Sequence, residues 1–101
     1  MTITVEIQGP IASITLSGYV DYSNQEEIRN ARDKVLSADH IQEIRVDFAT
    51  VTFMDSAIIR TLLNLQRETG AQGKTLVLMN VNEYTREVFE LGGFDKLFTF
   101  R

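Results

Sequence analysis

The residues from 51 to 63 form the pattern that most restricts how this chain can fold. They read Val-Thr-Phe-Met-Asp-Ser-Ala-Ile-Ile-Arg-Thr-Leu-Leu. The apolar residues before Asp55 are typical of the end of a buried strand. Those after Ser56 recur at the spacing of a helix with a buried face. The run therefore predicts a strand that turns tightly into a helix at Asp55 and Ser56.

Two roles are open for Ser56 at the start of this helix. Asp and Ser are common N-cap residues, so Asp55 or Ser56 can accept a hydrogen bond from an amide of the first turn. Alternatively, Ser56 presents an accessible hydroxyl where the helix dipole and free amides tolerate added negative charge, as a phosphoacceptor requires. The residue types alone do not separate a structural cap from a phosphoacceptor.

The N-terminal part of the chain predicts a hairpin and a helix. Residues 2–7 and 12–16 alternate polar and apolar side chains around a Gly-Pro turn, which is typical of two antiparallel strands. Ser23 and Glu26 have the spacing of a capping box and predict a helix that runs to about Ala38. Its inward-facing residues are then Ile28, Ala31, Val35 and Leu36.

Strands and helices alternate in the rest of the chain. Residues 44–48 predict a strand, and the helix that begins near Ser56 is expected to end by Gly70, a C-cap glycine. Thr75–Met79 is continuously apolar, as in a strand covered on both faces. Asn82 is expected to cap a third helix, followed by a short strand within residues 97–100. The inward-facing residues of that helix are predicted to be Val88, Phe89 and Leu91.

This order predicts an α/β fold in a single domain spanning residues 1–101. Helical crossovers imply parallel pairing of the later strands, whereas the opening hairpin adds an antiparallel pair. We therefore expect a mixed sheet, with an N-terminal antiparallel hairpin and then parallel strands, against which the helices pack.

Composition argues against several classes of function. The net charge is −4 and Lys and Arg do not cluster, which disfavours nucleic acid and anionic membrane surfaces as partners. The chain has no cysteine, no apolar stretch of the ~20 residues that span a bilayer, and no signal-peptide pattern. We therefore expect a cytoplasmic protein that binds other proteins.

The sequence predicts neither an enzyme nor a metal protein. A hydrolase would need a base beside its nucleophile, but the single histidine, His40, lies in a polar loop expected at the opposite end of the sheet from Ser56. Asp21, Asp47 and Asp55 carry oxygen ligands, yet their spacing matches no calcium loop. We expect no catalytic residue, cofactor or metal.

Three motifs together resemble the STAS domain family, as found in stand-alone anti-sigma factor antagonists. Phe53-Met54-Asp55-Ser56 is similar to the family's phosphoserine motif, and Gly18-Tyr19-Val20-Asp21 is similar to the Gly-x-x-Asp that closes its hairpin. Leu91-Gly92-Gly93-Phe94-Asp95-Lys96-Leu97-Phe98 resembles its C-terminal helix end and following strand. The motifs occur in family order over nearly the whole chain.

The resemblance implies a partner-switching module. In such systems the unphosphorylated domain binds a serine kinase that doubles as an anti-sigma factor or a comparable switch protein. The kinase phosphorylates the motif serine, here Ser56, and a metal-dependent serine phosphatase removes the phosphate. Alternatively, the chain resembles those STAS domains that are not phosphorylated and serve as docking subunits of a larger complex, such as a lipid-transport system.

One departure from the family pattern concerns the residues after Ser56. The family usually has Ser/Ala-Gly-x-Gly there, whereas this chain has Ala57-Ile58-Ile59-Arg60. We expect partner specificity to depend on Ile58 and Arg60, which replace the two glycines. The expected partner-binding residues are Asp21, Asp55, Ser56, Ala57, Ile58 and Arg60.

Overall fold

The computed structural model describes residues 2–101 of the chain. Within these residues, helices alternate with strands after an opening pair of strands, and two of the helical segments, η1 and η2, are short 3₁₀ helices. In chain order the elements are β1 (Thr2–Gln8), β2 (Ile11–Val20), η1 (Tyr22–Asn24), α1 (Gln25–Leu36), β3 (Glu43–Met54), α2 (Ala57–Ala71), β4 (Thr75–Met79), α3 (Glu83–Leu91), η2 (Phe94–Leu97) and β5 (Thr99–Phe100).

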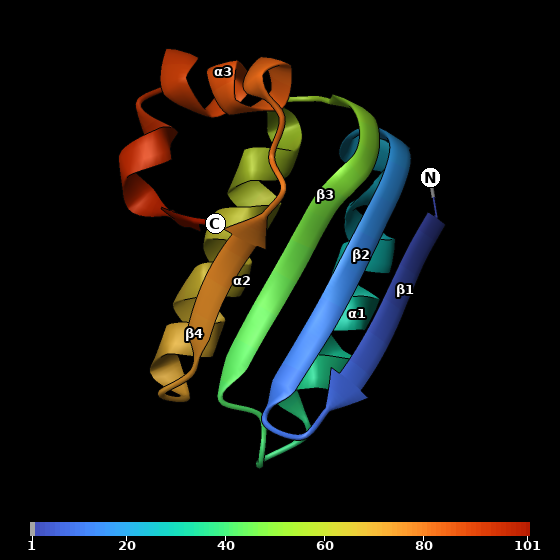
Figure 1. Ribbon diagram of the computed structural model, residues 1–101, viewed down its shortest axis with the longest axis vertical. Coiled ribbons are helices and arrows are strands. Elements are labelled where there is room, and N and C mark those ends of the chain that lie inside the picture. The colour runs from blue at the N-terminus through green and yellow to red at the C-terminus, as the bar shows by residue number, and fades with distance from the viewer. Residues whose placement is uncertain (1) are drawn as a thin grey trace.

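The strands lie in one sheet, in the order β1-β2-β3-β4-β5 (Figure 1). β1 and β2 form an antiparallel hairpin, and every later neighbouring pair is parallel. Parallel neighbours require a crossover, and α1, α2 and α3 supply the three crossovers in turn. The predicted fold class, a mixed sheet with an N-terminal antiparallel hairpin, is confirmed.

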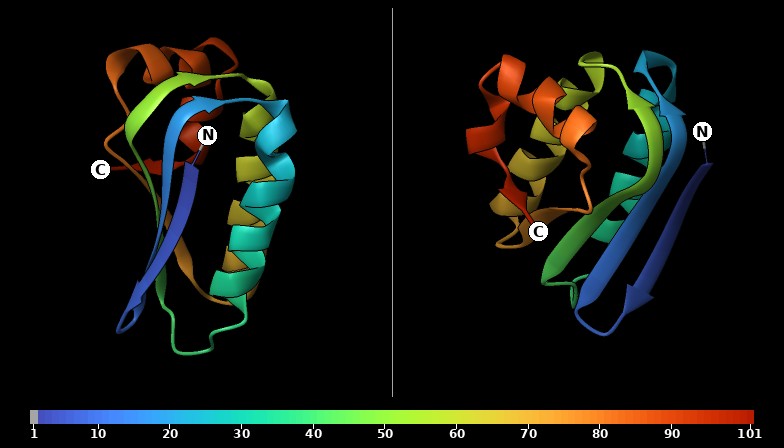
Figure 2. Two further views of the ribbon diagram at one scale, coloured as in Figure 1. Left: turned by 90° about the vertical axis from the view of Figure 1, so that its right-hand side faces the viewer. Right: turned by 45° about the horizontal axis from the view of Figure 1, so that its top comes forward.

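The two long helices, α1 and α2, lie side by side on one face of the sheet (Figure 2). The helices cover this face because it carries the apolar side chains of β2. Ala12, Ile14 and Leu16 are buried there, while Ser13 and Thr15 point to the other face. α3 lies across the end of the sheet at which the parallel strands finish (Figures 1 and 2). That end also carries the turn into α2.

The three central residues of β4 are buried on both faces of the strand, as predicted, although α1 and α2 share only one face of the sheet (Figure 2). Val77 points away from them but is still only 2 % exposed. Its register neighbours are Arg45 on β3 and Thr99 on β5. Side chains of adjacent strands therefore cover Val77, and a buried apolar residue here does not require a second layer of helices.

The capping box before α1 is formed by Asp21 and Asn24, not by Ser23 and Glu26. Asp21 Oδ1 accepts a hydrogen bond from the Ser23 amide at 2.9 Å, and Asn24 Oδ1 accepts one from the Asp21 amide at 2.9 Å. The Ser23 amide and hydroxyl both donate to Asp21. Ser23 therefore lies inside η1, and α1 begins only at Gln25.

The ends of the other two helices correct two predictions and confirm one. Gly70 lies within α2, and Gly73, with φ of +71°, has the left-handed conformation expected of a glycine after a helix. Leu91 is 89 % exposed, because α3 ends there beyond the core and Phe89 occupies the buried position instead. The cap at Asn82 is confirmed, since its Oδ1 accepts from the Thr85 amide at 2.7 Å.

Candidate functional site

The candidate site begins where β2 and β3 end together. Val20 lies opposite Met54 in the parallel register, and the next amide, that of Asp55, donates to the Val20 carbonyl at 2.9 Å. This bond fixes the turn into α2 beside the turn into η1. Asp21 and Asp55 each directly follow a strand end, so the two sequence-predicted carboxylates lie on neighbouring turns.

Asp55, not Ser56, caps α2 with its side chain. Asp55 Oδ1 accepts a hydrogen bond from the Ala57 amide at 2.9 Å, and the Asp55 carbonyl accepts one from the Ile58 amide at 3.0 Å. Ser56 occupies the N-cap position with helical dihedrals of −58° and −23°, but its side chain makes no capping bond. The capping role therefore belongs to Asp55, and the phosphoacceptor role of Ser56 stays a prediction.

Ser56 is exposed and chemically available. Within residues 2–101 no hydrogen bond involves its Oγ, although Asp55 beside it is only partly exposed. A hydroxyl in this state can enter another protein's active site without breaking an internal bond. Ala57 and Arg60 are also exposed, so the first turn of α2 presents a surface around Ser56.

The prediction that Ile58 is a partner-binding residue is wrong, because Ile58 is buried. Its side chain is 0 % exposed and belongs to the hydrophobic core beneath α2, as does Ile59 at 2 %. Helix periodicity explains the difference, because successive residues after Ser56 point in different directions around the helix. Of the two residues that replace the family glycines, only Arg60 reaches the surface.

A groove of about 490 Å³ runs beside Ser56 between the first turns of α1 and α2. The groove is lined by Tyr22, Gln25, Arg29, Ser56, Ala57, Ile59, Arg60, Thr61, Leu63, Asn64 and Phe94. Arg29 was missed as a site residue in the sequence because it comes from the other helix. Tyr22 follows the predicted site residue Asp21, but an aromatic residue beside a strand end is more often a packing residue. No local pattern shows that two helices whose first residues, Gln25 and Ala57, are 32 positions apart in the chain will meet.

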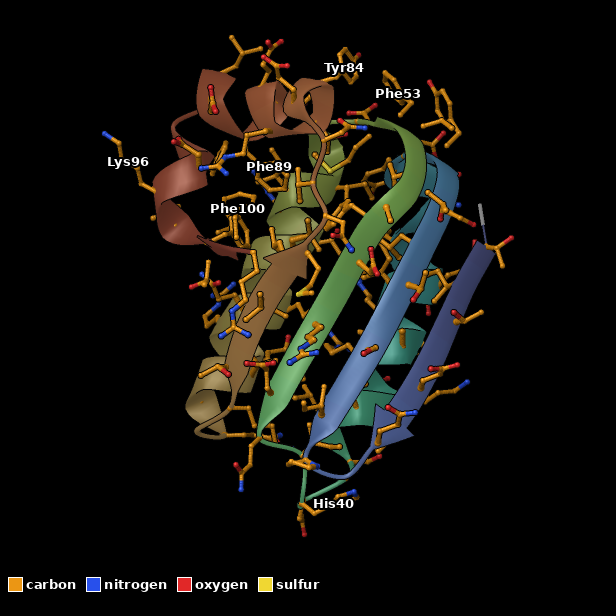
Figure 3. All side chains as sticks on the ribbon, in the orientation of Figure 1. His40, Phe53, Tyr84, Phe89, Lys96 and Phe100 are labelled. Carbon is orange, nitrogen blue, oxygen red and sulfur yellow. The ribbon has the colours of Figure 1, made fainter. Side chains whose placement is uncertain are left out.

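An aromatic pair lies at the same end of the sheet. Tyr19 of β2 stacks on Phe53 of β3 with ring centroids 4.4 Å apart, and Tyr19 is 55 % exposed. Figure 3 shows Phe53 and Tyr84 at this end. Exposed aromatic residues are common anchors in protein interfaces. The alternation in β2 gives a signal for Tyr19, because its position points away from the helices.

The remaining titratable residues considered in the sequence lie elsewhere. His40 is exposed at the opposite end of the sheet, as predicted (Figure 3). Asp47 accepts hydrogen bonds from the Ala49 amide at 2.8 Å and from Asn80 Nδ2 at 3.1 Å. Residues 2–101 contain no group of three acidic or histidine side chains placed to hold a metal ion. No helix in this part of the chain is long and apolar enough to cross a membrane.

The STAS domain family model matches residues 2–101 of the chain. The chain belongs to the STAS domain family. A STAS-domain containing protein of Pseudomonas aeruginosa is 24 % identical over 90 residues, which cover 89 % of this chain and 87 % of that protein. The resemblance drawn from the three sequence motifs is therefore confirmed at the level of the family.

Several solved structures superpose on nearly the whole chain. The Bacillus cell fate determinant SpoIIAA in its phosphorylated form matches with a TM-score of 0.75 and 24 % identity, covering 99 % of this chain and 91 % of that one. An anti-sigma factor antagonist from Mycobacterium paratuberculosis gives 0.83 and 22 %, covering 98 % and 83 %. A sulfate transporter family protein from Wolinella succinogenes gives 0.77 and 14 %, covering 90 % and 76 %. These likenesses establish a shared fold.

Proposed function

We propose that this STAS domain is a partner-switching regulator of the anti-sigma factor antagonist type. When unphosphorylated, it binds a serine kinase that also acts as an anti-sigma factor or comparable switch protein, and phosphorylation of Ser56 releases it. The observation that carries the proposal is the division of roles at α2: Asp55 makes the capping bond, so the exposed Ser56 hydroxyl remains available.

The proposed modification is a phosphoryl transfer from ATP. The Ser56 oxygen attacks the γ-phosphorus, the bond to the leaving ADP oxygen breaks, and a base of the kinase takes the hydroxyl proton. In the reverse direction, a metal-dependent phosphatase adds water to phosphorus and releases inorganic phosphate. All catalytic groups belong to the partner enzymes, and this chain supplies the acceptor.

Electrostatics explains how the phosphate would release the partner. A phosphoserine carries about −1.5 to −2 charges at pH 7, and here the charge adds to that of Asp55 next to it. A partner docked over Ser56 would have to desolvate both anions, and uncompensated buried charge costs several kcal/mol. Because about 1.4 kcal/mol is tenfold in affinity, two or three kcal/mol would suffice for a switch.

The direct experiment uses a serine kinase of the anti-sigma factor type from the same genome. The purified domain is incubated with this kinase and ATP, and peptide mass spectrometry locates the phosphate. We expect a single phosphate on Ser56 and none in Ser56→Ala, which retains the Asp55 cap and therefore the fold. If the kinase binds the domain but leaves Ser56 unmodified, the result would contradict the proposed partner switching and favour the alternative of a docking subunit.

A further inference from the structure

The groove beside Ser56 is positively charged, although the protein as a whole has a net charge of −4. Among residues 2–101, the only charged residues that line it are Arg60 of α2 and Arg29 of α1, and no carboxylate of this part of the chain does so. The groove is therefore suited to an anion.

The backbone amides of α2 do not provide the site for that anion. The Ala57 amide donates to Asp55 Oδ1 at 2.9 Å, and the Ile58 amide donates to the Asp55 carbonyl at 3.0 Å. The Ile59 amide donates to the Ser56 carbonyl at 3.0 Å. A phosphate on Ser56 would have to displace one of these bonds to gain the amide of Ala57, Ile58 or Ile59, so these three amides are not free to hold it. This observation replaces the expectation that free amides would hold the phosphate.

Arg60 lies one helical turn beyond Ser56. Because Ser56 already has helical dihedrals, the two side chains have the spacing of an i, i+4 pair on the helix surface. An anion at the N-terminal position and a cation four residues later is the favourable order of such a pair. Arg60 is exposed and forms no ion pair within residues 2–101.

Arg29 faces the same groove but is already engaged on α1. Its Nη1 lies 3.3 Å from Glu26 Oε2, and its Nη2 donates to Gln25 Oε1 at 3.2 Å. Arg29 therefore contributes positive potential to the groove, while Arg60 is the guanidinium without a carboxylate partner. Arg fits phosphate well, because its planar fork can donate two hydrogen bonds to two phosphate oxygens.

We propose that Arg60 binds the phosphate of phospho-Ser56 within the same chain, so that the phosphate lies in the groove between α1 and α2. This inference rests on the proposed function, in which Ser56 is phosphorylated. The usual family glycine at this position has no side chain for such a contact. The pairing stabilises the dianionic phosphate at lower pH.

The test does not depend on any kinase. Phosphoserine is incorporated at position 56 during translation by nonsense suppression, and the second ionisation of the phosphate is followed by ³¹P NMR. The comparison is between the phosphorylated protein with Arg60 and its Arg60→Gln variant. Arg67→Gln is the matched control: it removes an exposed arginine from the same helix but outside the groove. That residue lies 11 positions from Ser56, or about 16 Å along the helix.

We expect Arg60→Gln to raise the second pKa of the phosphate by roughly 0.3 units or more, given about 0.2–0.5 kcal/mol per i, i+4 pair and a doubly charged partner. Arg67→Gln should leave it unchanged, and Arg60→Lys should fall between. Equal pKa values in the protein with Arg60 and in Arg60→Gln would overturn the inference. A failure of the kinase to modify Ser56 would instead overturn the proposed function. The ³¹P titration would still measure the Arg60 contact, because its phosphoserine is encoded during translation.

Discussion

The Asp55 carboxylate accepts a 2.9 Å hydrogen bond from the Ala57 amide, across the intervening Ser56. This bond makes Asp55 the structural residue of the motif and leaves the exposed Ser56 hydroxyl for the chemical role that we propose. A motif of two adjacent polar residues can thus start a helix and present a reactive hydroxyl at once. The separation of roles can be measured, because each residue can be changed alone.

Removal of each side chain should affect stability differently. Asp55→Ala should lower the free energy of unfolding by about 1 kcal/mol, the usual cost of losing a side-chain cap. Ser56→Ala should change it by less than about 0.5 kcal/mol, since the Ser56 hydroxyl makes no capping bond and no other hydrogen bond within residues 2–101. Urea denaturation of both variants checks this, with Asp55→Asn as a control that keeps an acceptor oxygen. If Ser56→Ala lowered the free energy of unfolding as much as Asp55→Ala, the assignment of the cap to Asp55 would be wrong.

Substitutions at Ile58 and Arg60, the two positions that depart from the family pattern, should affect stability differently, because Ile58 lies in the core and Arg60 on the surface. Ile58→Ala should cost about 2–5 kcal/mol, because the side chain is fully buried. Arg60→Ala should stay within about 0.5 kcal/mol of the unmodified protein. Thermal or urea unfolding measures both. Nearly equal losses would mean that Ile58 is not part of the core.

An added charge beside Ser56 should weaken partner binding without unfolding the domain. Ala57 is exposed at the first turn of α2, where a glutamate is favourable to the helix. Ala57→Glu should therefore reduce kinase affinity at least tenfold, while stability stays the same or rises slightly. Isothermal titration calorimetry with the kinase measures the affinity. Gln72→Glu, the same charge change at the opposite end of α2, serves as control, and equal affinities for the two variants would exclude the α2 start from the interface.

Stability should fall at acid pH partly through Glu43. The hydrogen bond from Arg45 is the largest influence on this carboxyl and, with Arg101 nearby, holds its pKa below the ordinary value despite partial burial. A lowered folded-state pKa means that the charged form stabilises the fold above the unfolded-state pKa. That contribution is lost as pH falls through the folded-state pKa.

The free energy of unfolding should accordingly drop less steeply in Glu43→Gln than in the unmodified protein between about pH 5 and about pH 2. Urea denaturation at a series of pH values gives both curves. Other carboxylates titrate in both proteins and cancel in the difference. Parallel curves over this range would show that Glu43 has the same pKa in the folded and unfolded states.

Local pattern predicted those parts of the fold that depend on neighbouring residues in the chain. Alternation in β2, the Asn82 cap and the strand Thr75–Met79 all follow from spacing within a few residues, and all three are present. The capping box predicted at Ser23 was wrong, because the sequence offers two such pairs. Asp21 lies three residues before Asn24, and Ser23 lies three residues before Glu26. The strand pairing at Val20 decides between them.

Features that depend on tertiary packing were not predictable in this way. Leu91 matches the apolar period of α3 but lies past the edge of the core. Ile58 belongs to the buried apolar stripe that the helix spacing predicts, and only its position in the family motif placed it among the partner-binding residues. The groove requires α1 and α2 to meet, so Arg29 gives no local signal of its place beside Ser56. The sequence predicted Ser56 as the phosphoacceptor, whereas the charged residues around it became visible only in the fold.

The most direct test of partner switching compares one binding constant in two states of the same protein. The affinity of the kinase partner is measured for the unmodified domain and for the domain with phosphoserine encoded at position 56. The account predicts that the phosphate weakens binding at least tenfold, while circular dichroism shows the same fold in both. Equal affinity in the two states would contradict the claim that Ser56 controls partner choice.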